Sequence, residues 1–158
     1  QNICKNTPSY DLFEGISGFP DAGGEWIDFN NTGQLINGRF NAEATPPGTY
    51  NFIYKVPGHD CFFDDQTTVV VVTQPLPDAG EDGSVNVCSG ATVVLFDFLG
   101  GTPQGGGSWL DPAGVAHLGT FDPATDAEGN YTYILGSTNP ACPQDSNAAV
   151  VSVDTILN

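Results

Sequence analysis

Two stretches of the chain alternate between side chains of different character with a period of two residues. Tyr50, Phe52, Tyr54 and Val56 occupy every second position of 50–56. The segment 131–135 repeats the pattern with Tyr, Tyr and Leu at its odd-numbered positions. Because successive side chains of a β-strand point to opposite faces, both stretches predict half-buried strands.

The rest of the second half of the chain consists of short apolar runs separated by turn residues. The predicted strands there are 84–88, 92–96, 108–110, 115–118, a weak one near Phe121, 130–135 and 148–153. Between two of them, Asp111-Pro112-Ala113-Gly114 has the residues of a type I turn. Short strands with turns every 8–12 residues are typical of an all-β sandwich.

The two halves of the chain share one order of distinctive residues. Aligning Cys88 with Cys4 also aligns Leu95-Phe96 with Leu12-Phe13, Trp109 with Trp26, Phe121 with Phe40, 129–134 with 48–53, Cys142 with Cys61, and 150–153 with 69–72. The offset changes only from 84 residues (88 minus 4) to 81 (142 minus 61). The order indicates a tandem duplication. We predict repeat 1 at 1–74, an acidic Pro/Gly hinge at 75–84, and repeat 2 at 85–158.

A Gly-x-Tyr motif stands near the start of one strand in each repeat, at 48–50 and at 129–131. It resembles the tyrosine corner of immunoglobulin-like sandwiches, in which the hydroxyl bonds to the preceding loop. The predicted fold is therefore two tandem immunoglobulin-like β-sandwiches.

The net charge of the chain limits which classes of molecule it can bind. The chain has 19 Asp and Glu against three cations, Lys5, Arg39 and Lys55, and its formal net charge is -16. Nucleic acid and anionic membranes need a basic surface, so both are disfavoured. No apolar run approaches the roughly 18 residues of a membrane-spanning helix. Gln1 does not begin a signal peptide, so we expect a fragment of a longer protein.

Four cysteines allow three pairings. One disulfide within each repeat selects Cys4–Cys61 and Cys88–Cys142, each worth roughly 4 kcal/mol on the chain-entropy model. A metal site is the alternative, but no Cys-x-x-Cys spacing occurs. Disulfides place the protein outside the reducing cytosol.

Trp26 and Trp109 each follow a double glycine, with one residue in between. They are predicted to pack in the core against the disulfides; the alternative is a platform on which a sugar ring stacks. His59 and His117 occupy non-equivalent positions, and we predict a surface or turn role for both. No catalytic motif is present, so enzymatic activity is not expected.

The hinge contains the only notable cluster of acids. Asp78, Glu81 and Asp82 are candidate ligands for Ca²⁺, which prefers oxygen donors. The alternative is that these residues form turns and face water. No other cofactor is expected.

The run Asp78-Ala79-Gly80-x-Asp82-Gly83-Ser84-x-x-Val87-Cys88-Ser89-Gly90, followed by Gly-Gly-Thr-Pro, Gly-Thr-Phe-Asp-Pro and Gly-x-Tyr-x-Tyr, resembles repeat units of giant Bacteroidetes surface proteins. That family is exported by the type IX system and includes the mobile adhesin of flavobacterial gliding. The resemblance covers the second repeat almost entirely, whereas the first departs from it. Asp154-Thr155-Ile156 also resembles the O-glycosylation signal of that phylum.

The resemblance implies an extracellular, non-catalytic repeat segment of a cell-surface adhesin, acting as a stalk and in surface attachment. Its partners would be neighbouring repeats of the same chain and surface glycans, without nucleic acid and without membrane insertion. The alternative function is a carbohydrate-binding module of a secreted protein, with Trp26 and Trp109 in the binding surface.

Overall fold

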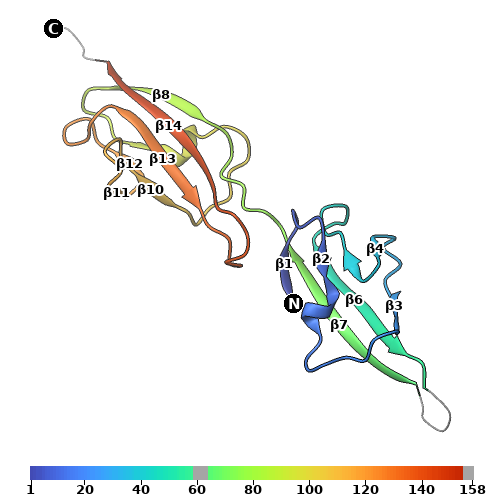
Figure 1. Cartoon of the computed structure of the whole chain (residues 1–158). Helices are drawn as coiled ribbons and strands as arrows, with labels where there is room; N and C mark the ends of the chain where they lie inside the picture. Colours follow the sequence, from blue (N-terminus) through green and yellow to red (C-terminus); the bar gives the residue numbers. More distant parts are fainter. Residues whose placement is uncertain (59–63, 155–158) are drawn as a thin grey trace. The chain divides into compact units, whose positions relative to one another are not determined.

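A computed structural model describes residues 1–58 and 64–154 of the chain (Figure 1). Within these residues the protein is all-β, with two short 3-10 helices, η1 (Leu12–Gly15) and η2 (Leu95–Phe98). The strands are β1 (Asn2–Cys4), β2 (Tyr10–Asp11), β3 (Glu25–Asp28), β4 (Leu35–Ile36), β5 (Arg39–Phe40), β6 (Gly48–Val56), β7 (Asp65–Gln74), β8 (Gly83–Cys88), β9 (Val93–Val94), β10 (Ser108–Leu110), β11 (Ala116–His117), β12 (Thr120–Phe121), β13 (Gly129–Leu135) and β14 (Asp145–Asp154). None of the described helices is long and apolar enough to cross a membrane.

The chain divides into two compact units. The first contains Gln1–Leu76 together with Asn139–Cys142, and the second contains Pro77–Thr138 together with the described part of Pro143–Asn158. Each unit has its own hydrophobic core. The segment 139–142 is distant in sequence from the first unit, and its placement there bears on the cysteines discussed below.

In the first unit, a four-stranded sheet has the order β1-β7-β6-β3 and a three-stranded sheet has the order β2-β5-β4. β1 runs parallel to β7, and β6 runs antiparallel to it along nine residues of register from Gly48–Thr73 to Val56–Asp65. The fully buried side chains between the sheets include Leu12, Phe40, Phe52 and Val71. The alternation along 50–56 therefore predicted its strand correctly.

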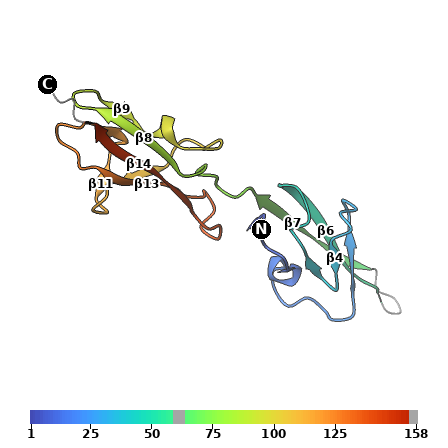
Figure 2. The same cartoon turned by 90° about the horizontal axis from the view of Figure 1, so that it is seen from above.

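The second unit has the same pairing scheme. Its main sheet has the order β11-β10-β13-β14-β8, and β12 pairs with β9. β8 runs parallel to β14, and β14 runs antiparallel to β13, as Figure 2 also shows. The core of this unit contains the buried side chains of Leu95, Phe121, Tyr131 and Tyr133. In this unit, too, the first strand lies beside the last one.

One predicted strand is partly wrong. The segment 92–96 was expected to be extended, but β9 contains only Val93 and Val94, and the chain then turns into η2. The corresponding Leu12-Phe13 of the first unit also lies in a 3-10 helix. In both helices the leucine is completely buried, at 0% exposure, and the phenylalanine joins an aromatic cluster. A strand would point these adjacent side chains to opposite faces, whereas the turn lets the leucine enter the core while the phenylalanine contacts the aromatic cluster, with Phe13 still 42% exposed.

The tyrosine hydroxyls behave as predicted. Tyr50 Oη donates a hydrogen bond to the Pro46 carbonyl oxygen at 2.6 Å, and Tyr131 Oη donates one to the Ala127 carbonyl oxygen at 2.7 Å. Each bond ties a strand to the loop four residues upstream. The predicted turn at 111–114 is present as well, because the Gly114 N–H donates to the Asp111 carbonyl oxygen at 2.9 Å.

Strand register corrects two details of the repeat alignment. Trp26 lies opposite Tyr54, and Trp109 lies opposite Tyr133, so Tyr54 rather than Phe52 is the structural equivalent of Tyr133. This shift of two residues keeps every side chain on its predicted face. In the last strand the alignment shifts by one residue, because Cys4 lies opposite Gln74 in the strand register and Cys88 lies opposite Asp154.

That one-residue shift changes which side chains correspond. The buried Val69 is equivalent to the buried Ala149, whereas the sequence alignment had matched it with Val150. Val150 is 42% exposed. Because side chains alternate along a strand, a slip of one position would have exchanged the core face for the solvent face.

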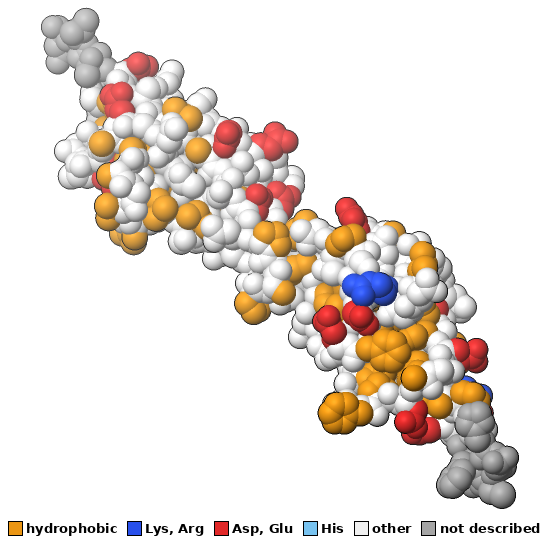
Figure 3. All heavy atoms as spheres, in the orientation of Figure 1, with side chains coloured by type: hydrophobic (Ala, Val, Ile, Leu, Met, Phe, Trp, Pro, Cys, Tyr) orange, Lys and Arg blue, Asp and Glu red, His pale blue; other side chains and the backbone are white. Residues whose placement is uncertain are grey.

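The charge distribution follows the sequence. On the face shown in Figure 3, acidic side chains (red) are scattered over both units rather than gathered in one place. The three cations all precede residue 56, so the second unit contains no Lys or Arg. Two of them form exposed ion pairs, Arg39 with Asp11 at 3.0 Å and Lys55 with Asp64 at 2.8 Å.

Candidate functional site

The cysteines pair differently from the prediction. The disulfide joins Cys4, at the end of β1, to Cys142, in the segment before β14, with the two Cα atoms 5.3 Å apart. Both cysteines are buried. Cys88, at the end of β8, is exposed and unbonded, and Cys61 lies outside the described residues. The predicted pairs Cys4–Cys61 and Cys88–Cys142 are therefore wrong.

Strand geometry explains the correction in the first unit. Cys4 lies beside Gln74, the last residue of β7, whereas the segment containing residue 61 rejoins β7 at its first residue, Asp65. Nine residue steps at about 3.3 Å separate the two ends of β7 by about 30 Å. A disulfide needs Cα atoms within about 7 Å, so the start of β7 is far outside the reach of Cys4, which is bonded to Cys142 instead.

The same argument applies to the second unit. Cys88 lies beside Asp154, the last residue of β14, and Cys142 precedes Asp145, the first residue of that strand, by three positions. The separation is again about 30 Å. The sequence alignment matched Cys88 with Cys4, and the strand pairing confirms this equivalence. It did not reveal that Cys88 and Cys142 flank opposite ends of β14.

The acidic segment is fastened to the second unit by hydrogen bonds. The Ala79 N–H donates to Asp145 Oδ2 at 2.8 Å, and the Asn147 amide donates to the Gly80 carbonyl oxygen at 2.6 Å. The backbone of Glu81 exchanges two hydrogen bonds of 2.8 Å with Gly100. Ala79 is completely buried in the core of this unit.

Two of the three predicted calcium ligands already accept hydrogen bonds. Asp78 Oδ1 accepts the Gly80 N–H at 2.9 Å, and Asp82 Oδ1 accepts the Ala148 N–H at 2.8 Å. Within residues 1–58 and 64–154, no three or more His, Cys, Asp or Glu side chains are grouped closely enough to hold a metal ion. Calcium binding by Asp78, Glu81 and Asp82 stays a prediction, which a titration described below tests.

Each tryptophan packs in an aromatic cluster of the same design. The ring centroids of Trp26 and Tyr54 are 5.1 Å apart and inclined at 43°, and those of Trp109 and Tyr133 have the same distance and angle. A phenylalanine from the 3-10 helix meets each tyrosine edge-on, Phe13 in the first unit and Phe96 in the second. The predicted packing partner was the disulfide, but the observed partner is tyrosine.

The glycines around the clusters are required by close approach. The hydroxyl of Tyr54 donates to the Asp21 carbonyl oxygen at 2.8 Å and accepts the Gly24 N–H at 3.0 Å. A Cβ on Gly24 would lie 2.6 Å from Tyr54 Cζ. Gly107 makes the equivalent bond to Tyr133 Oη at 2.7 Å. The glycine two residues before each tryptophan has no side chain, so the tyrosine hydroxyl can approach and bond to its backbone N–H.

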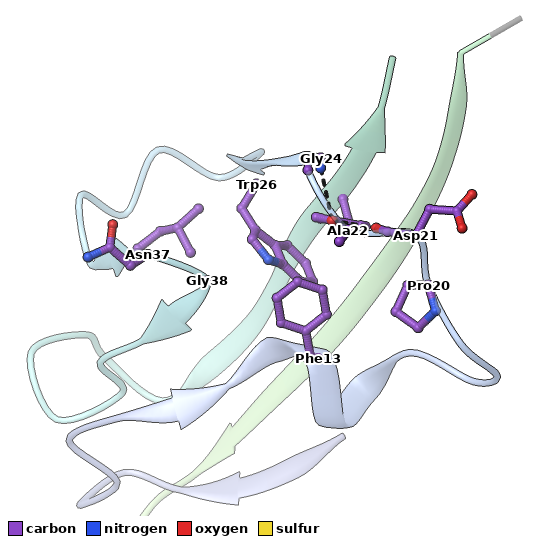
Figure 4. Close-up of a pocket in the computed structure, with 11 residues that line it drawn as sticks. Phe13, Pro20, Asp21, Ala22, Gly24, Trp26, Asn37 and Gly38 are labelled. Carbon is purple, nitrogen blue, oxygen red and sulfur yellow. Dashed lines mark hydrogen bonds between the residues drawn. The ribbon is translucent and has the colours of Figure 1, made fainter. Parts of the chain in front are cut away.

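A pocket of about 550 Å³ opens beside the tryptophan of the first unit (Figure 4). Trp26 and Phe13 form its aromatic side, and Asp21 and Asn37 supply polar lining. Figure 4 shows the Phe13 ring beside the indole, whereas the Asp21 carboxylate points away from both rings. Trp26 is half-buried. The pocket is thus aromatic in character with polar groups at its margin.

The equivalent pocket of the second unit is smaller, about 350 Å³. Gly105, Gly106 and Gly107 line it where the first unit has Asp21 to Gly24. Trp109 is only 7% exposed. Both tryptophans line their pockets, but Trp109 is buried in the expected core position, whereas Trp26 is half-buried and exposes more of its ring.

His117 supports a turn. Its Nδ1 accepts the Gly119 N–H at 3.1 Å, and its Nε2 lies 3.4 Å from Asp126 Oδ2. The Asp122 N–H donates to the same carboxylate at 2.7 Å. This backbone bond, followed by the histidine, holds the pKa of Asp126 below its ordinary value against the effect of burial. The predicted turn role of His117 agrees with these contacts; His59 and Thr155 lie outside the described residues.

Sequence reasoning overlooked the residues that complete these clusters. Phe13 and Tyr54 were noted only for the repeat and the strand pattern, and Asp145 and Asn147 were not noted at all, although Phe13 and Phe96 follow equivalent leucines. The available signal was that recurrence. The hydrogen bonds of Asp145 and Asn147 to the segment 79–80 connect residues more than 60 positions apart, and no local pattern indicates them.

Comparisons with known proteins support the fold alone. No family model matches the chain, and no curated protein matches it. Among solved structures, it is similar to an immunoglobulin-like fragment, the "I-band fragment I67-I69 from titin", with a TM-score of 0.53 and 12% sequence identity. The alignment covers 98% of this chain and 62% of the titin fragment. The protein therefore has an immunoglobulin-like all-β fold with one disulfide, Cys4–Cys142, among its described residues.

Proposed function

We propose that the chain is a non-catalytic pair of tandem immunoglobulin-like repeats from a large bacterial cell-surface adhesin. Its role is that of an extracellular stalk, which holds neighbouring repeats in series and contributes to surface attachment in gliding. The resemblance of residues 78–90 and the motifs that follow them to repeats of type IX-secreted Bacteroidetes proteins supports this origin.

The observation that carries the proposal is that one supporting framework is built twice. Both units pair their first strand parallel with their last strand, and both place a tryptophan against a tyrosine at 5.1 Å. In both, a glycine admits the tyrosine hydroxyl. The two units share the core and the hydrogen bonds that hold it, whereas the polar lining of their two pockets differs. Selection on the framework alone is what a spacer requires.

The disulfide supports an extracellular location. Cys4 and Cys142 are 138 positions apart, and a bond between them persists only outside the reducing cytosol. The net charge of -16 suits a soluble, exposed segment. Neither property requires a cofactor or an active site, and we infer that the segment is not an enzyme.

Labelling of intact cells tests this function. Antibodies raised against the 158-residue chain are expected to stain unpermeabilised cells of the source organism, and brief treatment of those cells with an external protease should remove the signal. Staining that appears only after permeabilisation would refute a surface location. Deletion of the segment is expected to shorten the stalk or weaken the attachment of cells to a surface, without loss of any catalytic activity.

Carbohydrate binding is the second candidate function, and the larger pocket of the first unit favours it. The pocket presents the half-buried Trp26 beside Phe13, with Asn37 at its margin. Sugar rings stack on such aromatic faces. Titration with neutral oligosaccharides should then shift Trp emission, and the shift should vanish in Trp26→Phe but persist in Trp109→Phe. Emission that no sugar alters would exclude this function.

A further inference from the structure

Cys88 has the same place in the second unit as Cys4 has in the first. Each is the last residue of the first strand of its unit, β1 or β8. Each lies beside the final residue of the last strand, Gln74 or Asp154, in a parallel pair. The sequence alignment, which begins from these two cysteines, agrees with this structural equivalence.

The two equivalent cysteines differ in bonding. Cys4 is bonded to Cys142, and Cys88 is exposed and without a disulfide among the described residues. In terms of the duplicated sequence, Cys142 belongs to the copy that follows the copy of Cys4. The observed bond therefore joins the first-strand cysteine of one copy to the cysteine before the last strand of the next copy.

Pairing within a copy is excluded by distance. In the second unit the length of β14, about 30 Å, separates the position beside Cys88 from the start of the strand that Cys142 precedes. A Cα separation above about 7 Å forbids a disulfide. Cys142 is in any case already bonded to Cys4. A partner for Cys88 must therefore come from another copy.

We propose that Cys88 forms a disulfide with the cysteine equivalent to Cys142 in a further copy of the repeat, so that successive copies are cross-linked in series. The inference rests on the proposed function, in which this pair of repeats belongs to a longer array. Its second support, besides the exposed thiol, is that the equivalent residue Cys4 already makes this bond to the following copy.

The reaction is a two-electron oxidation. The thiols of Cys88 and its partner each lose a proton, their sulfurs form one S–S bond, and two electrons pass to a disulfide of a thiol–disulfide oxidoreductase. That oxidant accepts the two protons and leaves as a dithiol. The exchange proceeds by attack of a thiolate, which requires an accessible sulfur, and the exposed Cys88 meets this condition.

The arrangement has a mechanical consequence. A cut in the chain between Cys4 and Cys142 leaves two pieces that the disulfide still holds together. If every copy repeats the bond, an array stays covalently continuous after a cut in any segment that a disulfide encloses. For a stalk exposed to proteases, this continuity preserves attachment.

Disulfide mapping of the full-length protein, isolated from its own cells, tests the inference. Free thiols are blocked with iodoacetamide before denaturation, and the protein is digested with chymotrypsin without reduction. The expected product is the Cys88 peptide bonded to a peptide of a further copy. Alkylated Cys88, a bond from Cys88 to Cys61 or Cys142, or a full-length protein without a further copy would overturn the inference. Recovery of the Cys4–Cys142 peptide shows that native bonds survived the procedure.

A Cys88→Ser variant of the full-length protein supplies the matched control. It should lose this one cross-link, keep the Cys4–Cys142 bond, and gain a single alkylated cysteine at the former partner. If no new free thiol appears, Cys88 had no partner. The surface-labelling experiment gives an independent answer for the function: a surface-exposed array with alkylated Cys88 overturns the cross-link and leaves the stalk function standing.

Discussion

Loss of the Cys4–Cys142 disulfide should destabilise the protein strongly, and Cys142→Ser is the direct perturbation. The bond closes a loop of 138 residues. In the chain-entropy model, a loop of that length restricts the unfolded chain by about 5 kcal/mol at 25 °C. This figure is an upper estimate because residual structure in the unfolded chain reduces it.

Urea unfolding measures the effect. With a slope of about 2 kcal/mol per molar urea, a loss of about 5 kcal/mol lowers the midpoint by about 2.5 M. Tryptophan emission follows both units, because Trp26 belongs to the first and Trp109 to the second. Cys4→Ser should give the same shift, and the double variant should be no less stable than either single one, since all three remove the same bond.

The matched control is Cys88→Ser. Cys88 is exposed and unbonded, so the substitution should change the free energy of unfolding by less than about 0.5 kcal/mol. The reasoning fails if Cys142→Ser leaves the midpoint in place, or if Cys88→Ser lowers it as much as Cys142→Ser does. Either result would mean that the stabilising disulfide involves other cysteines.

Four further predictions concern the frameworks of the two units. Gly107→Ala should destabilise the second unit by about 1–3 kcal/mol, because the added Cβ would lie 2.5 Å from both the Ile134 carbonyl oxygen and Tyr133 Cζ. Thermal unfolding measures this loss, and Gly105→Ala, which has open space around the added Cβ, is the control that should unfold as the unchanged protein does. Tyr131→Phe should lower stability by about 1 kcal/mol through loss of the bond to Ala127, whereas Tyr10→Phe, whose hydroxyl makes no hydrogen bond within the described residues, should leave the urea midpoint unchanged. Asp126 has a lowered pKa in the folded chain, chiefly because it accepts the Asp122 N–H. The stabilisation from this carboxylate is therefore complete above the ordinary carboxyl pKa and disappears as the pH falls through the folded-state pKa. In a pH series, the melting temperature of Asp126→Asn should fall less steeply toward acid than that of the unchanged protein. Finally, the calcium hypothesis predicts heat on calorimetric titration with Ca²⁺ and a higher melting temperature, both abolished in Glu81→Gln; a titration without heat or change in melting temperature refutes it.

Local patterns predicted most of the strands. The alternation at 50–56 and 131–135, the turn at 111–114 and the Gly-x-Tyr motifs all depend on residues close in sequence. Such features follow from backbone geometry, since side-chain period and turn chemistry are properties of a few neighbouring residues. The strand predicted at 92–96 was partly wrong because burial of adjacent Leu95 and Phe96 needs a 3-10 turn, which depends on the core around them.

Register was less accessible to the sequence. The alignment paired Phe52 with Tyr133 and Val69 with Val150, whereas the sheets pair Tyr54 with Trp26 and place the buried Val69 in the position of Ala149. Similar residues recur every second position in these strands, so two alignments appear equally good in the sequence. The sheets select one of them: pairing with Trp26 identifies Tyr54, and in the last strand, where the slip is one residue, the other alignment would match the buried Val69 with the exposed Val150.

The sequence by itself determined that the chain is built of short strands, that its two halves repeat, and that Cys88 corresponds to Cys4. Only the tertiary structure decided which cysteines bond. The reason is a length: a strand of ten residues spans about 30 Å, and a disulfide joins Cα atoms within about 7 Å. Cys88 and Cys142 belong to one repeat but flank opposite ends of β14, and Cys142 bonds to Cys4 of the preceding copy instead.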